Sequence, residues 1–141
     1  MHEKQILLLC KSILEIVKLY PQLSQAQKAS LNKITFKVNP RLTSVVGRAT
    51  ISGSDFGLIE ISLPVAERNN LMGDLVDTIL HEIAHILEPD AGHGLAWKLI
   101  ARKIGCTAER LAAPNIKKGL NASQKAKKES EALKSDLIDL L

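Results

Sequence analysis

HEIAHILEPDAGH, residues 81–93, is the stretch that decides how this chain folds and which chemistry it can carry. His81 and His85 lie four residues apart, so on a helix their imidazoles project from one face, one turn apart. Two such imidazoles can share one Zn²⁺, and Glu82 between them can reach a metal-bound water as general base. The five-residue motif alone makes a zinc hydrolase one hypothesis, which its surroundings must support.

The residues around the motif predict an amphipathic helix from about Leu71 to Glu88, capped by Asn69 or Asn70. Its apolar residues recur every four positions and mark the face that points to the core. The two histidines lie off that face, as a metal site at the floor of a cleft requires. Pro89 ends the helix, because the residue before a proline is pushed out of the α region. The expected core stripe is Leu71, Leu75, Ile79, Ile83 and Leu87.

A third ligand is needed, since catalytic zinc usually takes three protein side chains and leaves one position for water. His93 is the best candidate, because the Pro-Asp-Ala-Gly turn before it can fold it back over the helix. Glu109 is the rival, since one type of zincin takes a glutamate from the next helix. Glu88 is interpreted either as a group that orients a ligand or as a solvated carboxylate. The HExxHxxGxxH pattern is excluded, because Glu88 stands where its glycine should be.

Composition predicts one globular domain, since 141 residues can bury about two-thirds of the surface that the unfolded chain exposes. Residues 6–10 could pass for a signal sequence, but Lys11 and Glu15 interrupt the apolar run and no cleavage site follows. No stretch approaches the ~18 apolar residues of a membrane span. Cys10 and Cys106 lack any ligand spacing and are interpreted as buried thiols. We expect a cytoplasmic protein without membrane contact, in the host cytoplasm if a virus encodes it, with association with DNA as an alternative location.

Alternating apolar and polar residues predict three strands between the first helix and the HEIAH helix. A turn with two glycines and Asp55, residues 52–57, joins the second strand to the third, and Pro64 ends the third. The expected strands are residues 34–38, 45–52 and 58–63.

The other helices follow from 3.6-residue periodicity. An amphipathic helix precedes Pro21, residues 24–31 can form a short helical turn, and a helix over 95–104 ends at Gly105. The last segment is also amphipathic, with Leu133, Leu137 and Leu140 at helical spacing. We divide the chain into a domain of residues 1–113 and a basic connector with a C-terminal helix, residues 114–141.

The segment HEIAHILEPDAGHGLAWKLIARKIG, residues 81–105, resembles the signature of the SprT-like metallopeptidases. That signature is HExxH, a short turn, His-Gly-x-x-Trp/Phe-Lys, and an Ala-Arg-Lys/Arg-aliphatic-Gly helix. Residues 36–51 resemble the strand pair of the family with its Gly-Arg centre, and residues 57–69 resemble its Leu-x-x-x-x-Arg-Asn stretch. The resemblance spans about residues 1–110 in the correct order.

The resemblance implies an α+β, zincin-like metallopeptidase domain with an N-terminal helix, a small three-stranded sheet, the HExxH helix, a following helix and a C-terminal helical tail. It implies that His81, His85 and His93 bind Zn²⁺ and that Glu82 is the catalytic general base of a zinc endopeptidase. Several relatives act on proteins that are crosslinked or tightly bound to DNA. The implied partners are therefore a protein or peptide substrate and DNA, while no oligomeric state is predicted.

This chain departs from many relatives at its C-terminal end, where no cysteine pair follows Cys106 to form a zinc ribbon. It ends instead in a lysine-rich segment. The net charge of +4 is compatible with nucleic-acid contact and also with an ordinary solvated surface. The candidate nucleic-acid contacts are Lys117, Lys118, Lys125, Lys127 and Lys128, with a solvated linker as the alternative.

Four further side-chain roles are hypotheses. Asp77, one turn before His81, is expected on an exposed helix face, with orientation of His81 as the alternative. Trp97 is expected to anchor the second helix by packing. The strand of residues 58–63 is a candidate to pair with an extended substrate, if it lies at the sheet edge. The candidates for stabilising the oxyanion are Arg48, Arg68 and Lys98, while Tyr20, the only tyrosine, lies far from the motif in the sequence.

Two hypotheses from different classes follow. The first is a zinc endopeptidase that acts on DNA-associated proteins. The second is a non-proteolytic, metal-stabilised module that docks on nucleic acid or a partner protein. Glu82 favours the first, because a purely structural zinc site has no use for a base beside its ligands. A fourth protein ligand would favour the second.

Overall fold

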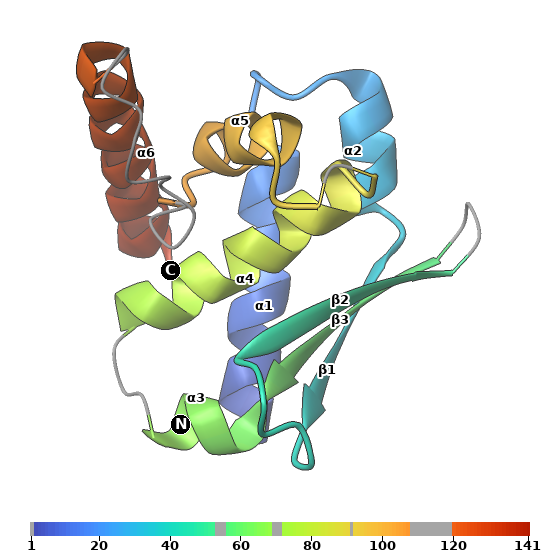
Figure 1. Ribbon diagram of the computed structural model, residues 1–141. Coiled ribbons are helices and arrows are strands. Elements are labelled where there is room, and N and C mark those ends of the chain that lie inside the picture. Colours follow the sequence, from blue (N-terminus) through green and yellow to red (C-terminus); the bar gives the residue numbers. More distant parts are fainter. Residues whose placement is uncertain (1, 53–55, 69–71, 91, 108–119) are drawn as a thin grey trace.

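The computed structural model describes residues 2–52, 56–68, 72–90, 92–107 and 120–141, and this part of the chain is a mixture of helices and one small sheet (Figure 1). Within these residues no helix has both the length and the apolar character needed to cross a membrane. In chain order the elements are α1 (Glu3–Lys18), α2 (Gln25–Leu31), β1 (Ile34–Asn39), β2 (Gly47–Ser52), β3 (Phe56–Ser62), α3 (Leu63–Arg68), α4 (Met72–Leu87), α5 (Leu95–Lys103) and α6 (Leu120–Leu140). The predicted α+β class is confirmed.

The sheet has the order β1-β3-β2, with β1 parallel and β2 antiparallel to β3. The strand offered for substrate pairing, residues 58–63, is therefore the central strand, and its two edges are already occupied. Residues 45–52 form a shorter strand than predicted, since β2 begins at Gly47. Because β1 and β2 are the edge strands, an added peptide strand has to pair with one of them.

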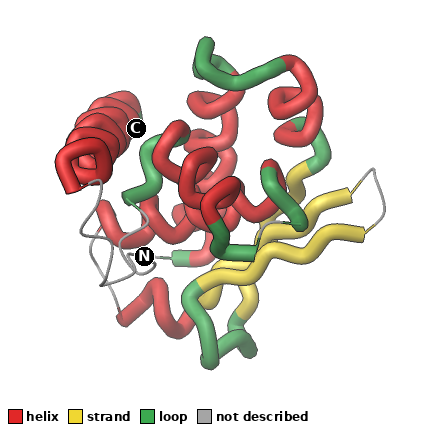
Figure 2. Tube along the Cα trace, turned by 45° about the horizontal axis from the view of Figure 1, so that its top comes forward, coloured by secondary structure: helices red, strands yellow, loops and turns green. Residues whose placement is uncertain are grey.

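Helices α1 and α4 pack against one face of the sheet, which Figure 2 shows beside the helical layer. Ile59 and Ile61 of β3 point to these helices and are fully buried. Helix α1 contributes its buried apolar face to the same core, and the backbone N–H of His2 donates to Gln5 Oε1 at 2.9 Å to close the helix start. Both cysteines are free and buried, as predicted.

Helix α3 follows β3 directly, whereas the sequence pattern predicts only that Pro64 ends the strand. Proline fits the first turn of a helix, where its missing N–H would have no partner within the helix. Ser62 begins the helix, because its Oγ accepts a hydrogen bond from the Val65 N–H at 3.1 Å. The same hydroxyl donates to the Leu42 carbonyl. Ser62 therefore links the end of β3 to both the preceding loop and α3.

Helix α4 lies at the centre of the fold and contacts α1, α2, α5, α6 and the sheet. Four residues of its predicted stripe are buried, namely Leu75, Ile79, Ile83 and Leu87. The fifth, Leu71, lies outside the described residues. Four more apolar side chains of this helix are also buried: Val76, Leu80, Ala84 and Ile86. The helix is therefore enclosed on more than the one face that the periodicity indicated.

The C-terminal helix α6 packs into the same core as the rest of the chain. Its Leu137 is 1% exposed, and Ser130 Oγ donates to the Cys106 carbonyl at 2.7 Å. Gly105, with a φ of 98°, lets the chain turn closely beneath α6 after α5. The boundary predicted between residues 113 and 114 lies outside the described residues, but the helix beyond it is joined to the domain by these contacts.

Replacing Leu137 with Ala should lower the free energy of unfolding by about 2–4 kcal/mol, because it leaves a cavity in a fully enclosed site. Leu140→Ala on the same helix is the matched control, since Leu140 is 72% exposed and should change stability by less than about 0.5 kcal/mol. Urea denaturation followed by far-UV circular dichroism measures both. Equal values for the two variants would contradict the packing of α6 on the domain.

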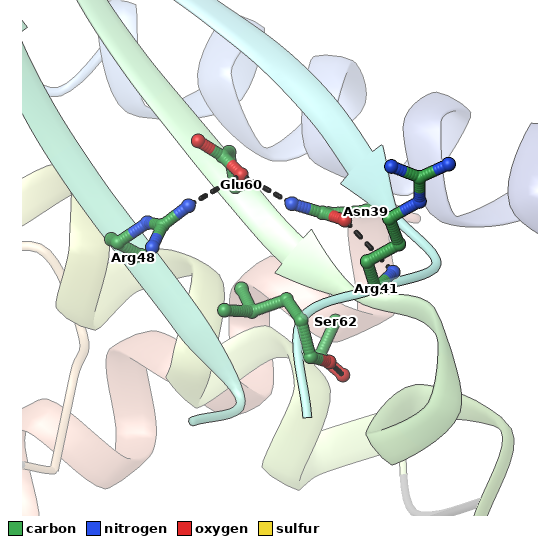
Figure 3. A network of polar contacts seen from close by, with 6 residues as sticks. Asn39, Arg41, Arg48, Glu60 and Ser62 are labelled. Atoms are coloured by element: carbon green, nitrogen blue, oxygen red, sulfur yellow. Dashed lines mark hydrogen bonds and ion pairs between the residues drawn. The ribbon is translucent and has the colours of Figure 1, made fainter. Parts of the chain in front are cut away.

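The outer face of the sheet carries a polar network centred on Glu60 (Figure 3). One carboxylate oxygen, Oε2, accepts hydrogen bonds from Asn39 Nδ2 at 2.7 Å and Arg48 Nη2 at 3.1 Å. Asn39 Oδ1 in turn accepts from the Arg41 backbone N–H at 2.9 Å. The Asn39 hydrogen bond, with help from Arg48, lowers the pKa of Glu60 below its usual value. The network therefore stabilises the ionised carboxylate and joins all three strands.

Glu60→Gln should destabilise the protein by about 1 kcal/mol at neutral pH, because it removes the charge from these hydrogen bonds. A lowered folded-state pKa adds stability above the unfolded-state pKa, about 4.3, and this contribution disappears as the pH falls through the folded-state value. The difference between variant and wild type should therefore shrink below about pH 4. Urea denaturation across this range measures it, with exposed Glu67→Gln as the control. A difference that stays constant with pH would argue against the network.

Candidate metal centre

Three histidine side chains converge at the C-terminal end of α4. His81 and His85 come from consecutive turns of this helix, and His93 lies just before α5. The Nε2 atoms of His81 and His85 are 3.2 Å apart, those of His81 and His93 are 3.1 Å apart, and those of His85 and His93 are 2.8 Å apart. The structure thus brings together the three residues predicted as ligands.

The donor set of this cluster fits a metal ion. A neutral imidazole Nε2 carries either a proton or a lone pair, so two of three mutually close Nε2 atoms must be of the same kind. Hydrogen bonds therefore cannot satisfy all three pairs, whereas a cation can accept three lone pairs at once. Tetrahedral zinc with Zn–N bonds of about 2.0–2.1 Å sets its ligand nitrogens about 3.3–3.4 Å apart, close to the spacing found here.

The protonation state of His85 favours the same conclusion. Burial lowers the pKa of His85 to about 4, and the neighbouring His93 adds to the effect. Its imidazole is therefore neutral at pH 7, which is the form that binds a metal. Among the described residues, these three histidines are the His, Cys, Asp or Glu side chains that lie close enough together, as a group of three or more, to share a metal ion. Glu109, the rival ligand, lies outside the described residues.

Trp97 of α5 lies against all three histidine rings. The distances between ring centroids are 4.6 Å to His81, 5.3 Å to His85 and 5.0 Å to His93. The indole is fully buried, so the prediction of a packing anchor is confirmed. It also fixes the orientations of the three imidazoles, a role that the sequence analysis did not foresee.

Glu82 lies on the same helix, beside the cluster and against β2. Glu82 is only 7% exposed, and its carboxylate accepts a hydrogen bond from the backbone N–H of Ala49. Burial raises the pKa of Glu82 to about 7, and the Ala49 hydrogen bond opposes this rise. A carboxyl group with this pKa can both accept and donate a proton near neutral pH.

The cluster and Glu82 line a cleft of about 990 Å³. One wall is β2 with the loop before it, and the other walls come from α3, α4 and α6. Its apolar lining includes Val45 and Ile51, which flank Gly47 and Ala49 on β2. Besides Glu82, the charged residues that line the cleft in the described part of the chain are Asp74, Asp77, Glu131 and Lys134.

The edge of β2 borders this cleft. The Ser62 N–H donates to the Val46 carbonyl at 2.8 Å, which makes these two residues a hydrogen-bonded pair of the antiparallel ladder. Because such pairs alternate, Gly47, Ala49 and Ile51 direct their backbone groups away from β3 and toward the open edge. The Ala49 N–H that binds Glu82 is one of these edge groups.

A comparison with protein families matches residues 14–125 of the chain to the SprT-like family. The match covers most of the 141 residues. The chain belongs to the SprT-like family. No curated protein and no solved structure was found to match it. Family membership indicates a domain of the metalloprotease type, and it confirms the resemblance inferred from residues 81–105.

In this SprT-like protein Asp77 does not lie on an exposed helix face as expected. Its Oδ1 accepts hydrogen bonds from the Thr107 N–H at 2.8 Å and from Thr107 Oγ1 at 3.1 Å. Lys134 Nζ of α6 lies 3.6 Å from the same oxygen. Asp77 therefore ties α4 to the chain after α5 and to α6, whose part beyond residue 125 lies outside the family match.

None of the three candidate oxyanion residues lines the cleft in the described part of the SprT-like chain, and Tyr20 does not line it either. Arg48 lies on the opposite face of the sheet with Glu60, and burial raises the pKa of Tyr20 to about 12 within the core. The cation that does line the cleft among these residues is Lys134. Sequence pattern alone gives no sign of Lys134 in the cleft, because only tertiary packing brings α6 to α4.

The lysine-rich segment is only partly described. Lys117 and Lys118 lie outside the described residues, and Lys125 and Lys127 belong to α6 without a description of their side chains. Lys128 is exposed. The nucleic-acid role of these five lysines stays a prediction.

Proposed function

We propose that this protein is a zinc-dependent endopeptidase of the SprT-like type. The observation that carries the proposal is the convergence of three histidine Nε2 atoms beside a buried glutamate, in a cleft bordered by an open strand edge. Each component has a separate use in peptide hydrolysis. The histidines can hold a metal ion, the glutamate can act as a base, and the strand edge can bind an extended chain. Membership of the SprT-like family supports the same activity.

His81, His85 and His93 would hold the metal ion. A set of three imidazoles is typical of catalytic zinc, which leaves a position for water or substrate. When bound, Zn²⁺ supplies Lewis acidity, which makes water more acidic and a substrate carbonyl more electrophilic.

Glu82 is proposed to carry the proton during hydrolysis. Its carboxylate accepts a proton from water as the water oxygen forms a bond to the carbonyl carbon of the substrate. The same group then donates this proton to the amine nitrogen as the C–N bond breaks. Burial raises the pKa of Glu82 to about 7 in the metal-free protein, and a cation held by the neighbouring histidines would lower it and favour the ionised, proton-accepting form.

The substrate is proposed to lie along β2, in place of the β3 position considered from the sequence. The backbone groups of Gly47 and Ile51 and the Ala49 carbonyl face the open edge, so an extended peptide can add a strand there beside the Ala49 N–H that binds Glu82. Such a peptide would cross the cleft beside Glu82. This mode of binding requires an unfolded or flexible stretch in the substrate protein.

DNA-associated proteins, including proteins crosslinked to DNA, are the proposed substrate class. This part of the proposal is supported by the resemblance to relatives that act on such proteins and by the net charge of +4. The lysine-rich segment is the candidate DNA contact. If it contacts phosphates, DNA binding should weaken steeply as the salt concentration rises.

The test is a cleavage assay with the purified full chain loaded with zinc and a DNA-binding protein as substrate, with and without single-stranded or duplex DNA. Chelation of the metal should abolish cleavage, and addition of zinc should restore it. Stimulation by DNA would support the DNA-associated substrate class, whereas cleavage indifferent to DNA would support a general endopeptidase. An absence of cleavage under all conditions, with zinc bound, would instead support the metal-stabilised binding module.

A further inference from the structure

The cleft face of β2 alternates between large and small residues. Gly47, Ala49 and Ile51 are two residues apart in β2, so they lie on the face of the sheet that meets α4, and Val45 lines the same cleft from the loop before β2. The two outer residues are bulky and half-exposed, whereas the two central residues are the smallest possible. The small pair is where β2 passes Glu82.

Gly47 is in direct contact with the stem of Glu82. A Cβ atom added to Gly47 would lie 3.1 Å from Glu82 Cγ, 3.3 Å from Thr78 Cγ2 and 3.4 Å from the Glu60 carbonyl oxygen. The three neighbours belong to three different residues, on α4 and β3. The contact at 3.4 Å is an ordinary van der Waals distance, but the two at 3.1 and 3.3 Å are tighter than normal, so a methyl group at this position requires the Glu82 and Thr78 side chains to shift by a few tenths of an ångström.

Ala49, the next residue on this face, binds the other end of the same side chain. Its N–H points to the open edge of β2 and donates to the Glu82 carboxylate. Gly47 thus leaves room for the Glu82 methylene groups, and the Ala49 N–H holds the Glu82 carboxylate. Both contacts place the carboxylate at the strand edge, where the scissile bond of a paired substrate would lie.

We propose that Gly47 is a positioning residue that sets where the Glu82 carboxylate lies, by letting the Glu82 stem pass between α4 and β2 to reach the Ala49 N–H. This inference rests on the proposed peptidase function for its catalytic consequence, but the geometry of Glu82 can be tested without activity. The substitution that tests it is Gly47→Ala.

Gly57 provides a matched control on the same sheet. A Cβ added to Gly57 would also have its nearest neighbour at 3.1 Å, but all the close atoms belong to the Ile86 side chain. The closest is Ile86 Cδ1, the mobile end of that side chain, which can rotate away. Gly57→Ala therefore introduces the same methyl group against the same helix without touching Glu82.

The first measurement is the chemical shift of the Ala49 amide proton by NMR, in zinc-free and zinc-loaded protein. Gly47→Ala should move this resonance upfield, because the hydrogen bond to the carboxylate lengthens, while Gly57→Ala should leave it unchanged. The second measurement is kinetic. Gly47→Ala should lower kcat by about 10–100-fold with KM changed less than about threefold, whereas Gly57→Ala should keep kcat within about twofold of wild type.

A third variant guards against simple misfolding. Thr78→Ser removes the Cγ2 methyl group, so Gly47→Ala combined with Thr78→Ser should recover part of the lost kcat and shift the Ala49 amide back toward wild type. In a Glu82→Gln background, Gly47→Ala should cause little further loss, because it acts through Glu82.

The inference is overturned if the Ala49 amide and kcat respond equally to Gly47→Ala and Gly57→Ala, or if the effects of Gly47→Ala and Glu82→Gln multiply. An inactive wild type would refute the proposed function instead. In that case the Ala49 amide shift alone would decide the positioning role of Gly47.

Discussion

Replacing Glu82 with Gln should lower kcat for peptide hydrolysis by about 10³-fold, because the amide cannot accept the proton from water or return it to the leaving amine. The substitution is nearly isosteric, and its site is 7% exposed, so the local packing should persist. Metal binding should also persist, since the three histidine Nε2 atoms belong to other residues. The measurements are steady-state cleavage rates and the zinc content of the purified protein.

Glu88→Gln is the matched control for this prediction. Glu88 follows α4 directly and does not line the cleft in the described part of the chain, so the same change of carboxylate to amide should leave kcat within about twofold. If Glu82→Gln cleaved the substrate as fast as wild type with the same zinc content, the proposed base would be wrong. Loss of zinc in Glu82→Gln would instead indicate that Glu82 supports the metal site.

Replacing Trp97 with Ala should lower the free energy of unfolding by about 3–5 kcal/mol. Trp97 is among the largest fully buried side chains of the described residues, so its loss leaves a large cavity between α5 and α4. The cavity would lie beneath the three histidines, whose rings all contact the indole. We therefore expect a second effect, a decrease in zinc affinity of about 10–100-fold, as for other residues that orient metal ligands.

Leu99→Ala is the control on the same helix, because Leu99 is 60% exposed and should change stability by less than about 0.5 kcal/mol. Trp97 is the only tryptophan of the chain, so unfolding has to be followed by far-UV circular dichroism instead of fluorescence. Zinc affinity is measured by competition with a chelator of known affinity. A Trp97→Ala protein with wild-type stability and zinc affinity would contradict the anchoring role.

Much of the candidate site could be predicted because it is local in the chain. The four-residue spacing of His81 and His85 places both imidazoles on one helix face, and Pro89 ends that helix wherever it packs. His93 follows after a short turn, so its return to the helix needs little more than backbone geometry. Features that depend only on neighbouring residues in this way can be predicted without any knowledge of the tertiary fold.

The predictions that failed depend on contacts between distant segments. Residues 58–63 form the central strand because β1 and β2 pair with its two edges. The alternation of apolar and polar residues along one strand shows which face is buried, but it does not show whether the strand lies at an edge of the sheet. Asp77 was assigned to an exposed face because Thr107 and Lys134, which bind it, come from elements that follow much later. Helix α3 was missed because a proline at a strand end can also occupy a first helical turn.

The sequence by itself determined the HEIAH helix, its end at Pro89 and the placing of His81 and His85 on one helix face, since these follow from helical periodicity and backbone sterics. The choice of His93 over Glu109 as third ligand came from the resemblance to the SprT-like family. Only the tertiary structure decided which strand edge borders the cleft, that Gly47 faces the Glu82 side chain, and that Trp97 lies against all three imidazoles. Those features arise where the sheet, α4, α5 and α6 meet. The physical reason is that burial and close packing are properties of several segments together, so no single stretch of sequence encodes them.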